Sequence, residues 1–256
     1  MILTHPTPIL IKALVHHYYI QTKSPLKEIL LVYNILRFPI TLTLLTISTG
    51  LPALANDGPI KIACVGDSIT FGAGVQNREV NAYPQVLDRT FGESVKVMNF
   101  GRSGATLLKN GDLPYWKTDQ FRQATEFQPD IVIIKLGTND SKPHNWKKKD
   151  EYGPDLVDMV NHFRSLESRP TIYLCKPVPV PKPAFGITEE IVGGEVIPLV
   201  VQVAKQTKCR VIDLYSALLE TPENIPDGVH PNAAGAAKMA ETVYEAITKR
   251  NGKLRK

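Results

Sequence analysis

Cysteine is scarce in this chain, which has only three cysteines among 256 residues, Cys64, Cys175 and Cys209. Their spacings match no metal-binding pattern. Cys175 ends one predicted strand and Cys209 opens the next, so in a parallel sheet their Cα atoms would lie farther apart than the roughly 7 Å limit for a disulfide. We therefore expect three free, mostly buried thiols, and no metal site.

A long uninterrupted apolar run is also missing. The segment 36–55, LRFPITLTLLTISTGLPALA, comes closest, but Pro39 and Pro52 make it a poor membrane-spanning helix, which needs about 20 mostly apolar residues. Its Arg37, its apolar stretch and the small residues that end at Ala55 instead match a secretory signal.

This signal predicts how the chain is organised. We expect an N-terminal extension and signal peptide over residues 1–55, cleavage after Ala55, and one catalytic domain over residues 56–256. Residues 1–27 resemble no part of a signal, so we expect translation to start after them. The mature protein would be secreted or periplasmic, without stable insertion in a membrane.

A strongly basic surface is lacking in the expected domain. The net charge of the whole chain is +5, but residues 1–55 contain four Lys or Arg residues and only one Glu. No stripe of Lys and Arg interleaved with aromatic residues marks a nucleic-acid surface, and we interpret the basic stretch 142–150 as a solvated loop. We expect no nucleic-acid partner. The composition, 43% hydrophobic and 21% charged, is that of a globular protein.

What the chain does have is a regular alternation of short apolar runs and longer amphipathic segments. This alternation predicts a parallel sheet with helices on both faces in a single α/β domain. We expect strands over 60–65, 95–100, 131–136, 171–175 and 210–214, and helices over 82–91, 115–127, 152–167, 189–205 and 232–249. Asn81 with Pro84, and Asn232, suit helix starts. We interpret the Pro-rich stretch 176–186 as a loop on the active face; a domain boundary there is the alternative.

Polar clusters follow these strands at the edge where a parallel sheet carries its functional crevice. The first strand leads into Ser68, the second into Gly101 and the third into Asn139, and the fifth is followed by DGVHPN, residues 227–232. Each cluster alone has an ordinary explanation, because Ser and Asn cap helices and Gly forms turns. The joint pattern indicates an active site.

These residue types complement one another chemically. Asp227 and His230 are spaced so that the carboxylate can accept a hydrogen bond from one imidazole nitrogen, which leaves the other as a general base for Ser68. The backbone N–H groups of Ser68 and Gly101 and the side-chain amide of Asn139 can converge on an acyl oxyanion. We interpret Asp67 as structural, bonding local backbone.

The motifs GDSIT around Ser68, NFGRSG around Gly101, GTND around Asn139 and DGVHPN around His230 resemble the four sequence blocks of the SGNH, or GDSL, hydrolase family. The resemblance spans about residues 60–235. It implies a flavodoxin-like three-layer α/β/α fold, a catalytic triad of Ser68, His230 and Asp227, and an oxyanion hole from Ser68, Gly101 and Asn139. It also implies esterase, thioesterase, lipase or carbohydrate deacetylase activity without metal or other cofactor.

Other interpretations remain open. Ser103 in GRSGA nearly matches the nucleophile elbow of α/β-hydrolases, but Ala105 stands where that motif has Gly. His162 is expected to have a surface or capping role, and His144 lacks a well-spaced acid. A phosphate or flavin mononucleotide site is a different class, yet GDSITFGAG fits neither the dinucleotide nor the phosphate-loop motif. An acyltransferase or a non-catalytic carbohydrate-binding domain on the same fold is a further alternative.

The substrate is expected to be a small-molecule or oligosaccharide acyl ester. The aromatic residues Trp116 and Trp146 could stack on a sugar ring, with helix packing as the alternative, and His144 could line the pocket. The stretches GDLPYW and GTNDSKPHNW look like a family subgroup linked to sugar deacetylation, including sialate O-acetylesterase-like proteins. We therefore expect hydrolysis of short acyl esters, mainly O-acetyl groups on carbohydrate, with a lysophospholipase or thioesterase as the alternative.

Overall fold

The computed structural model describes residues 58–249. The expected extension, the signal peptide and the cleavage after Ala55 lie outside the described residues. Within residues 58–249, no helix is long and apolar enough to span a membrane.

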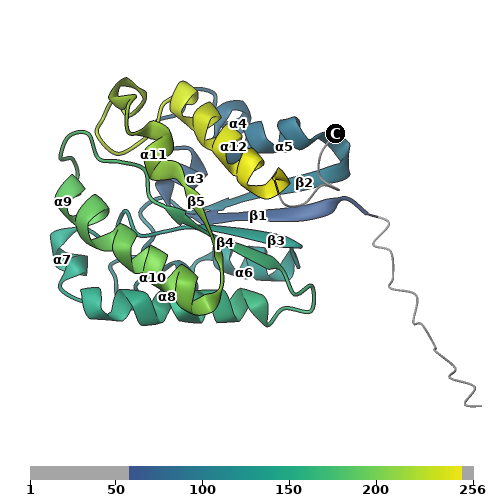
Figure 1. Ribbon diagram of the computed structural model, residues 1–256, viewed down its shortest axis with the longest axis horizontal. Coiled ribbons are helices and arrows are strands. Elements are labelled where there is room, and N and C mark those ends of the chain that lie inside the picture. Colours follow the sequence, from purple (N-terminus) through teal and green to yellow (C-terminus); the bar gives the residue numbers. More distant parts are fainter. Residues whose placement is uncertain (1–57, 250–256) are drawn as a thin grey trace, which may run out of the picture. The chain divides into compact units, whose positions relative to one another are not determined.

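Five parallel strands form one sheet in the order β2-β1-β3-β4-β5 (Figure 1). The predicted α/β fold with a five-stranded parallel sheet is confirmed. Each strand lies at its expected place, with ends that differ from the prediction by one residue: β1 (Ile60–Gly66), β2 (Val95–Gly101), β3 (Ile131–Lys135), β4 (Thr171–Lys176) and β5 (Arg210–Asp213).

The sequences of the strands explain their order in the sheet. Every residue of β3 is buried, as is most of β1, because a central strand is covered by helices on both faces. The edge strand β2 instead alternates buried and exposed positions along VKV and Met98. Uniformly apolar runs therefore mark the centre of the sheet, and alternation marks its edge.

Helices cover both faces of the sheet and complete the three layers (Figure 1). One core lies under α5 (Tyr83–Phe91), α11 (Leu214–Leu218) and α12 (Ala233–Thr248). The other core lies under α6 (Asp119–Glu126), α8 (Lys149–Arg164) and α10 (Ile197–Thr207). Shorter helices occupy the connections: α3 (Ser68–Phe71), α4 (Arg78–Asn81), α7 (Pro143–Trp146) and α9 (Glu189–Ile191), with 3₁₀ turns at Gly92–Ser94, Tyr115–Lys117 and Pro222–Asn224.

Helix starts and continuity agree with the sequence in part. The Asn232 side chain caps α12 by accepting a hydrogen bond from the Gly235 N–H, as expected. Asn81 does not cap α5, which begins after Ala82 without a side-chain cap. The helix expected over 189–205 is interrupted by a π-helical turn at Val192–Val196. The helix expected from residue 115 opens with a 3₁₀ turn and becomes α-helical only at Asp119.

The three cysteines are all free, as predicted. Cys64 and Cys175 are buried in the core, whereas Cys209 is partly exposed. Desolvation by burial raises the pKa of Cys64 to about 12 and also raises the pKa of Cys175. The two buried thiols therefore stay protonated and act as small apolar side chains.

Candidate active site

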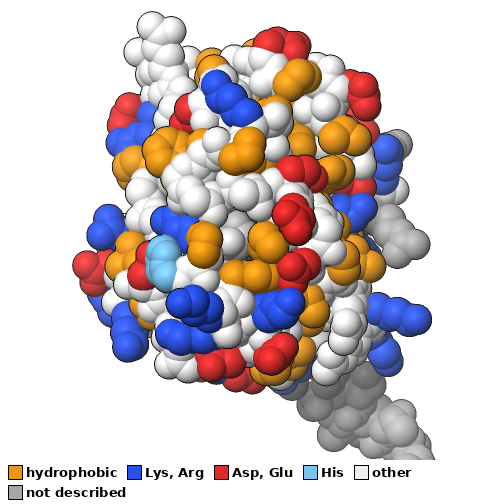
Figure 2. All heavy atoms as spheres, turned by 90° about the vertical axis from the view of Figure 1, so that its left-hand side faces the viewer, with side chains coloured by type: hydrophobic (Ala, Val, Ile, Leu, Met, Phe, Trp, Pro, Cys, Tyr) orange, Lys and Arg blue, Asp and Glu red, His pale blue; other side chains and the backbone are white. Residues whose placement is uncertain are grey.

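The candidate site lies where the carboxyl ends of the strands meet. Strands β1 and β3 are neighbours although β2 lies between them in the sequence, so the chain leaves the sheet in opposite directions after β1 and β3. Open parallel sheets bind their ligands at such a switch point. Helices α3, α7, α9 and α11 gather at this edge, on the left of Figure 1. Figure 2 looks onto it and shows hydrophobic side chains among charged ones.

Ser68 stands at this edge because β1 turns sharply into the one-turn helix α3. A Cβ on Gly66 would lie 2.1 Å from the Thr70 hydroxyl oxygen and 2.7 Å from the Lys135 carbonyl oxygen, so the turn needs glycine. Asp67 is the N-cap of α3, and its carboxylate accepts a hydrogen bond from the Ile69 N–H at 2.9 Å. Ser68 is thus the first residue of the helix.

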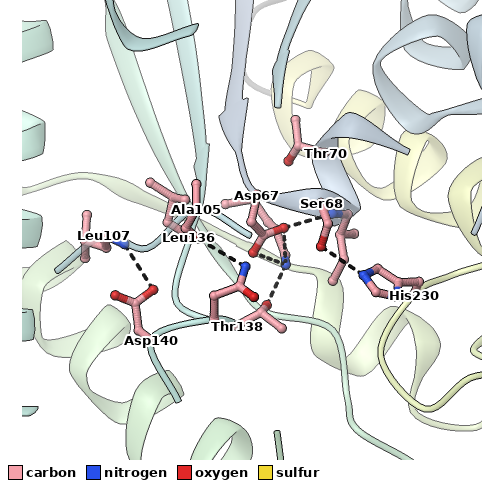
Figure 3. A network of polar contacts seen from close by, with 12 residues as sticks. Asp67, Ser68, Thr70, Ala105, Leu107, Leu136, Thr138, Asp140 and His230 are labelled. Carbon is pink, nitrogen blue, oxygen red and sulfur yellow. Dashed lines mark hydrogen bonds and ion pairs between the residues drawn. The ribbon is translucent and has the colours of Figure 1, made fainter. Parts of the chain in front are cut away.

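A chain of hydrogen bonds links three of the predicted residues. Ser68 Oγ lies 2.9 Å from His230 Nε2 (Figure 3), and His230 Nδ1 lies 2.7 Å from Asp227 Oδ2. The other carboxylate oxygen of Asp227 accepts hydrogen bonds from the N–H groups of Val229 and His230. The carboxylate therefore holds both the backbone and the ring of His230 in one orientation.

The ionisation of Asp227 follows from its surroundings. Its partial burial opposes ionisation, but the hydrogen bonds from the His230 and Val229 N–H groups and from the His230 ring outweigh it, so the pKa of Asp227 is lowered. An ionised carboxylate next to Nδ1 fixes the imidazole tautomer in which Nε2 accepts a proton, and it stabilises the imidazolium that then forms.

The structure brings the three expected oxyanion donors to the same edge. The Asn139 amide and the Gly101 N–H both donate hydrogen bonds within the protein. One hydrogen of the Asn139 amide goes to the Ala105 carbonyl oxygen at 3.1 Å, which leaves the second for a ligand. The Gly101 N–H donates to Asn99 Oδ1 at 2.9 Å, so this donor is already engaged. Gly101 also has a packing role, since a Cβ there would lie 2.1 Å from the Phe71 backbone nitrogen in α3.

Asp67 has a second partner that sequence reasoning missed. Lys135, the last residue of β3, is fully buried, and its ammonium lies 3.0 Å from Asp67 Oδ2 and 2.7 Å from Thr138 Oγ1. The prediction that Asp67 bonds local backbone is confirmed by its hydrogen bond from Ile69, but it describes only part of the role. The one sequence signal was a lysine at the end of the apolar run IVIIK.

Asp140, next to Asn139, is a second missed residue. It is fully buried, and its two carboxylate oxygens accept hydrogen bonds from the N–H groups of Leu107 and Leu108 at 3.0 and 2.7 Å. Desolvation by burial raises the pKa of Asp140 to about 7 against the opposing effect of those N–H groups. Asp140 therefore ties the loop after β2 to the loop after β3.

The residues expected to bind substrate differ in what they offer. Trp146 is only 7% exposed, packs on Tyr152 and donates its indole N–H to Glu195, and Trp116 packs on Phe121 and donates to the Leu107 carbonyl oxygen. Both indoles are held by internal packing, which is the alternative stated above; Trp146 is buried and Trp116 partly buried, and this packing speaks against sugar stacking. His144 is exposed and, contrary to expectation, has an acid partner, since its Nε2 lies 2.8 Å from Asp112 Oδ2.

The competing residues have other partners. Among the described residues, no hydrogen bond joins Ser103 to a histidine ring. His162 is not a plain surface residue, because its Nε2 lies 2.8 Å from the Thr125 hydroxyl and its ring packs on Phe121. Partial burial lowers its pKa. Within residues 58–249, no group of His, Cys, Asp and Glu side chains is arranged to hold a metal ion.

The chain is similar in sequence to known esterases. The model of the GDSL-like lipase/acylhydrolase family matches residues 64–238. An acetylxylan esterase of Xylanibacter ruminicola is 39% identical over 215 residues, which cover 77% of this chain and 45% of that protein. A multidomain esterase of Ruminococcus flavefaciens is 25% identical over 81% of this chain and 30% of its own length. The chain thus spans less than half the length of these relatives.

Solved structures share the fold at lower identity. A carbohydrate acetylesterase family member from Sinorhizobium meliloti superposes with a TM-score of 0.61 at 22% identity, covering 75% of this chain and 99% of that one. An acetylxylan esterase from Geobacillus stearothermophilus gives a TM-score of 0.58 at 22% identity, over 74% of this chain and 95% of that one. Since the family model spans most of the chain, the protein belongs to the GDSL-like lipase/acylhydrolase family of ester hydrolases.

Proposed function

We propose that this protein is a secreted serine esterase that removes short acyl groups, mainly O-acetyl groups, from carbohydrate. The observation that carries the proposal is the hydrogen-bonded series from Ser68 Oγ through His230 to Asp227, with distances of 2.9 and 2.7 Å. The acetylxylan esterase of Xylanibacter ruminicola supports carbohydrate as the alcohol part of the substrate. The signal pattern of residues 36–55 supports secretion.

The reaction proceeds by acyl transfer through a covalent intermediate. His230 Nε2 takes the Ser68 proton as Oγ attacks the ester carbonyl carbon, and the new C–O bond places negative charge on the former carbonyl oxygen. His230 then gives the proton to the leaving sugar hydroxyl as the ester C–O bond breaks. Water repeats the cycle on the acyl-enzyme, which releases acetate and restores Ser68.

The developing oxyanion is stabilised by the Ser68 N–H, the second hydrogen of the Asn139 amide and the Gly101 N–H. The Gly101 N–H must turn from Asn99 Oδ1 toward the substrate or be shared with it. Such donors contribute most in a site that is already fixed in place. The bond from Asn139 to the Ala105 carbonyl supplies this rigidity for the amide.

The test is acid release by purified residues 56–256 from 4-nitrophenyl acetate, butyrate and octanoate and from acetylated xylo-oligosaccharides. We expect activity on acetyl esters that is lost in Ser68→Ala and kept in Ser103→Ala, the matched serine control. Equal loss in both variants, or activity that survives Ser68→Ala, contradicts the nucleophile assignment. Preference for octanoate over acetylated sugars would favour the lysophospholipase or thioesterase alternative. Secretion is tested by N-terminal sequencing of the exported protein, which should begin at Asn56.

A further inference from the structure

The strongest unexplained feature near the site is the buried charge of Lys135. Both Lys135 and Asp67 are fully buried, and the lysine ammonium contacts both carboxylate oxygens of Asp67, at 3.2 and 3.0 Å, and Thr138 Oγ1 at 2.7 Å. Replacing such a pair by apolar residues of similar volume is often neutral or stabilising, so stability alone does not explain it. Its directional hydrogen bonds can fix the positions of the groups that they join, which an apolar pair cannot do.

The two partners of Lys135 lie at special places in the chain. Asp67 directly precedes Ser68 and caps the helix that carries it, and Thr138 directly precedes Asn139. In Figure 3, Asp67 lies between Ser68 and Thr138, with dashed lines marking these bonds. One ammonium therefore joins the turn after β1 to the loop after β3.

We propose that Lys135 is a positioning residue that holds the Ser68 hydroxyl and the Asn139 amide at a fixed separation through Asp67 and Thr138. This proposal rests on the proposed serine esterase function. A displacement of about 1 Å in such a constellation can cost roughly 100-fold in rate. The Thr138 hydroxyl is the link to Asn139, and it can be removed without uncovering a charge.

The matched pair Thr138→Val and Thr138→Ser tests the link. Valine keeps the shape and removes the hydroxyl, whereas serine keeps the hydroxyl. For 4-nitrophenyl acetate we expect kcat to fall roughly 10- to 100-fold in Thr138→Val with KM unchanged, and to stay near wild type in Thr138→Ser. A normal kcat in Thr138→Val, or equal losses in both variants, overturns the proposal. Thermal unfolding identifies a variant that has lost its fold.

A double-mutant cycle separates positioning from general loosening. If Thr138 acts through Asn139, adding Thr138→Val to Asn139→Ala should lower kcat by less than about threefold more. Fully additive losses overturn the proposal. The neutral pair Lys135→Met with Asp67→Asn should reproduce the kcat loss of Thr138→Val, and wild-type kcat in this folded variant also overturns it. Absence of Ser68-dependent activity in the wild type would refute the proposed function itself.

A separate observation concerns the loop after β4. Ala184 and Ile187 exchange two backbone hydrogen bonds, and the residues between them, Phe185 and Gly186, both have positive φ, 55° and 76°. This is the two-residue hairpin turn with left-handed central residues, which an aromatic residue rarely adopts. The turn holds the Phe185 side chain out, where it is 63% exposed.

This hairpin packs between the turn that carries His230 and helix α7. A Cβ on Gly228, next to Asp227, would lie 2.4 Å from the Lys182 carbonyl oxygen and 3.4 Å from Ala184 Cβ, so the hairpin and the residue pair before it pack on the turn that carries His230. On its other side, a Cβ on Gly186 would lie 3.4 Å from Pro143 Cδ in α7. The Phe185 ring lies 5.7 Å from the His230 ring, edge to face.

We infer that Phe185 is the platform on which the sugar ring of the substrate stacks, beside His230, where the leaving hydroxyl must lie. This inference also rests on the proposed function. An exposed aromatic ring favours the C–H face of a pyranose, and the packing of the hairpin fixes the backbone that carries the ring before substrate binds. The indoles of Trp116 and Trp146 are already packed and hydrogen-bonded inside the protein, which leaves this role to Phe185.

Phe185→Ala, Phe185→Tyr and the exposed-residue control Val201→Ala are compared on acetylated xylo-oligosaccharide and on ethyl acetate, which has no ring. We expect kcat/KM on the oligosaccharide to fall roughly tenfold more than kcat/KM on ethyl acetate in Phe185→Ala, and neither ratio to change in Phe185→Tyr or Val201→Ala. Equal loss on both esters, or no loss on the oligosaccharide, overturns the platform. Hydrolysis of ethyl acetate without any sugar ester by the wild type would overturn it too, while the serine esterase stands.

Discussion

Ser68 Oγ and His230 Nε2 lie 2.9 Å apart although 162 residues separate them in the chain. The hydroxyl is carried by the helix that follows β1, and the imidazole by the turn before α12, so only the folded domain brings the two atoms together. A contact of such long sequence separation needs the rest of the fold to offset its loop-closure entropy. Loss of acid release should therefore coincide with unfolding of the whole domain.

Asn139→Ala should lower kcat roughly 100- to 1000-fold on 4-nitrophenyl acetate, because it removes one preorganised donor from the oxyanion. The matched control is Asn161→Ala on α8, where the asparagine is exposed. Steady-state kinetics check both variants. A near-normal rate in Asn139→Ala would rule out the oxyanion role.

Asp227→Asn should lower kcat by about 10⁴-fold, because the amide cannot fix the required tautomer or stabilise the imidazolium. The pKa of Asp227 is lowered in the folded protein, so this carboxylate stabilises the fold above its unfolded pKa, and the stabilisation is lost as pH falls through the folded pKa. Urea unfolding between pH 3 and 6 should show a weaker acid destabilisation in Asp227→Asn than in the wild type. Equal pH profiles would contradict this assignment.

Asp140 should make the fold less stable as pH rises from about 4 to 7. Its folded pKa of about 7 lies above the ordinary value of 3.8, so in this range the folded protein keeps a proton that the unfolded chain has lost. The free energy of unfolding, measured with urea at pH 5 and pH 8, should drop between these values in the wild type. Asp140→Asn should reduce that drop, whatever its cost at both pH values, and an unchanged drop would refute the interpretation.

The thiols should react in two classes. Cys64 and Cys175 are buried with raised pKa values, whereas Cys209 is partly exposed near the Arg164 guanidinium. Titration of the native protein with a disulfide reagent at pH 8 should modify one thiol per chain quickly, and denaturant should release the other two. Cys209→Ser should abolish the fast phase; a fast phase that remains would show that a core cysteine is accessible.

The sheet and the four polar clusters were predictable because their signals are local. Strand β3 is buried throughout and reads as an apolar run, and Asn232 caps α12 within three residues of its own position. Glycines at strand ends and polar residues after them indicate the functional edge of a parallel sheet. Each of these features depends only on residues that are close together in the sequence.

The missed features depend on partners far apart in the chain. Lys135 is 68 residues from Asp67, and as the end of IVIIK it gave no sign that its ammonium would be buried. Asp112 lies 32 residues from His144, so spacing could not identify the acid. The indole of Trp146 is covered by Tyr152 through tertiary packing, which composition cannot foresee. The pairing of the Gly101 N–H with Asn99 is local, yet side-chain orientation decides it.

The hairpin at Ala184–Ile187 is closed by its own two backbone hydrogen bonds and leaves its tip residue free of the sheet. The groups that would break the ester bond lie in α3, at the end of β2, in the loop after β3 and in the turn at His230, and the group that would meet the sugar lies in this separate hairpin. Exchange of Phe185-Gly186 for another two-residue pair of the same turn type should therefore change which alcohol is accepted without rebuilding the reaction centre. In such a fold, substrate range can diversify through one small module while the hydrolytic chemistry stays constant.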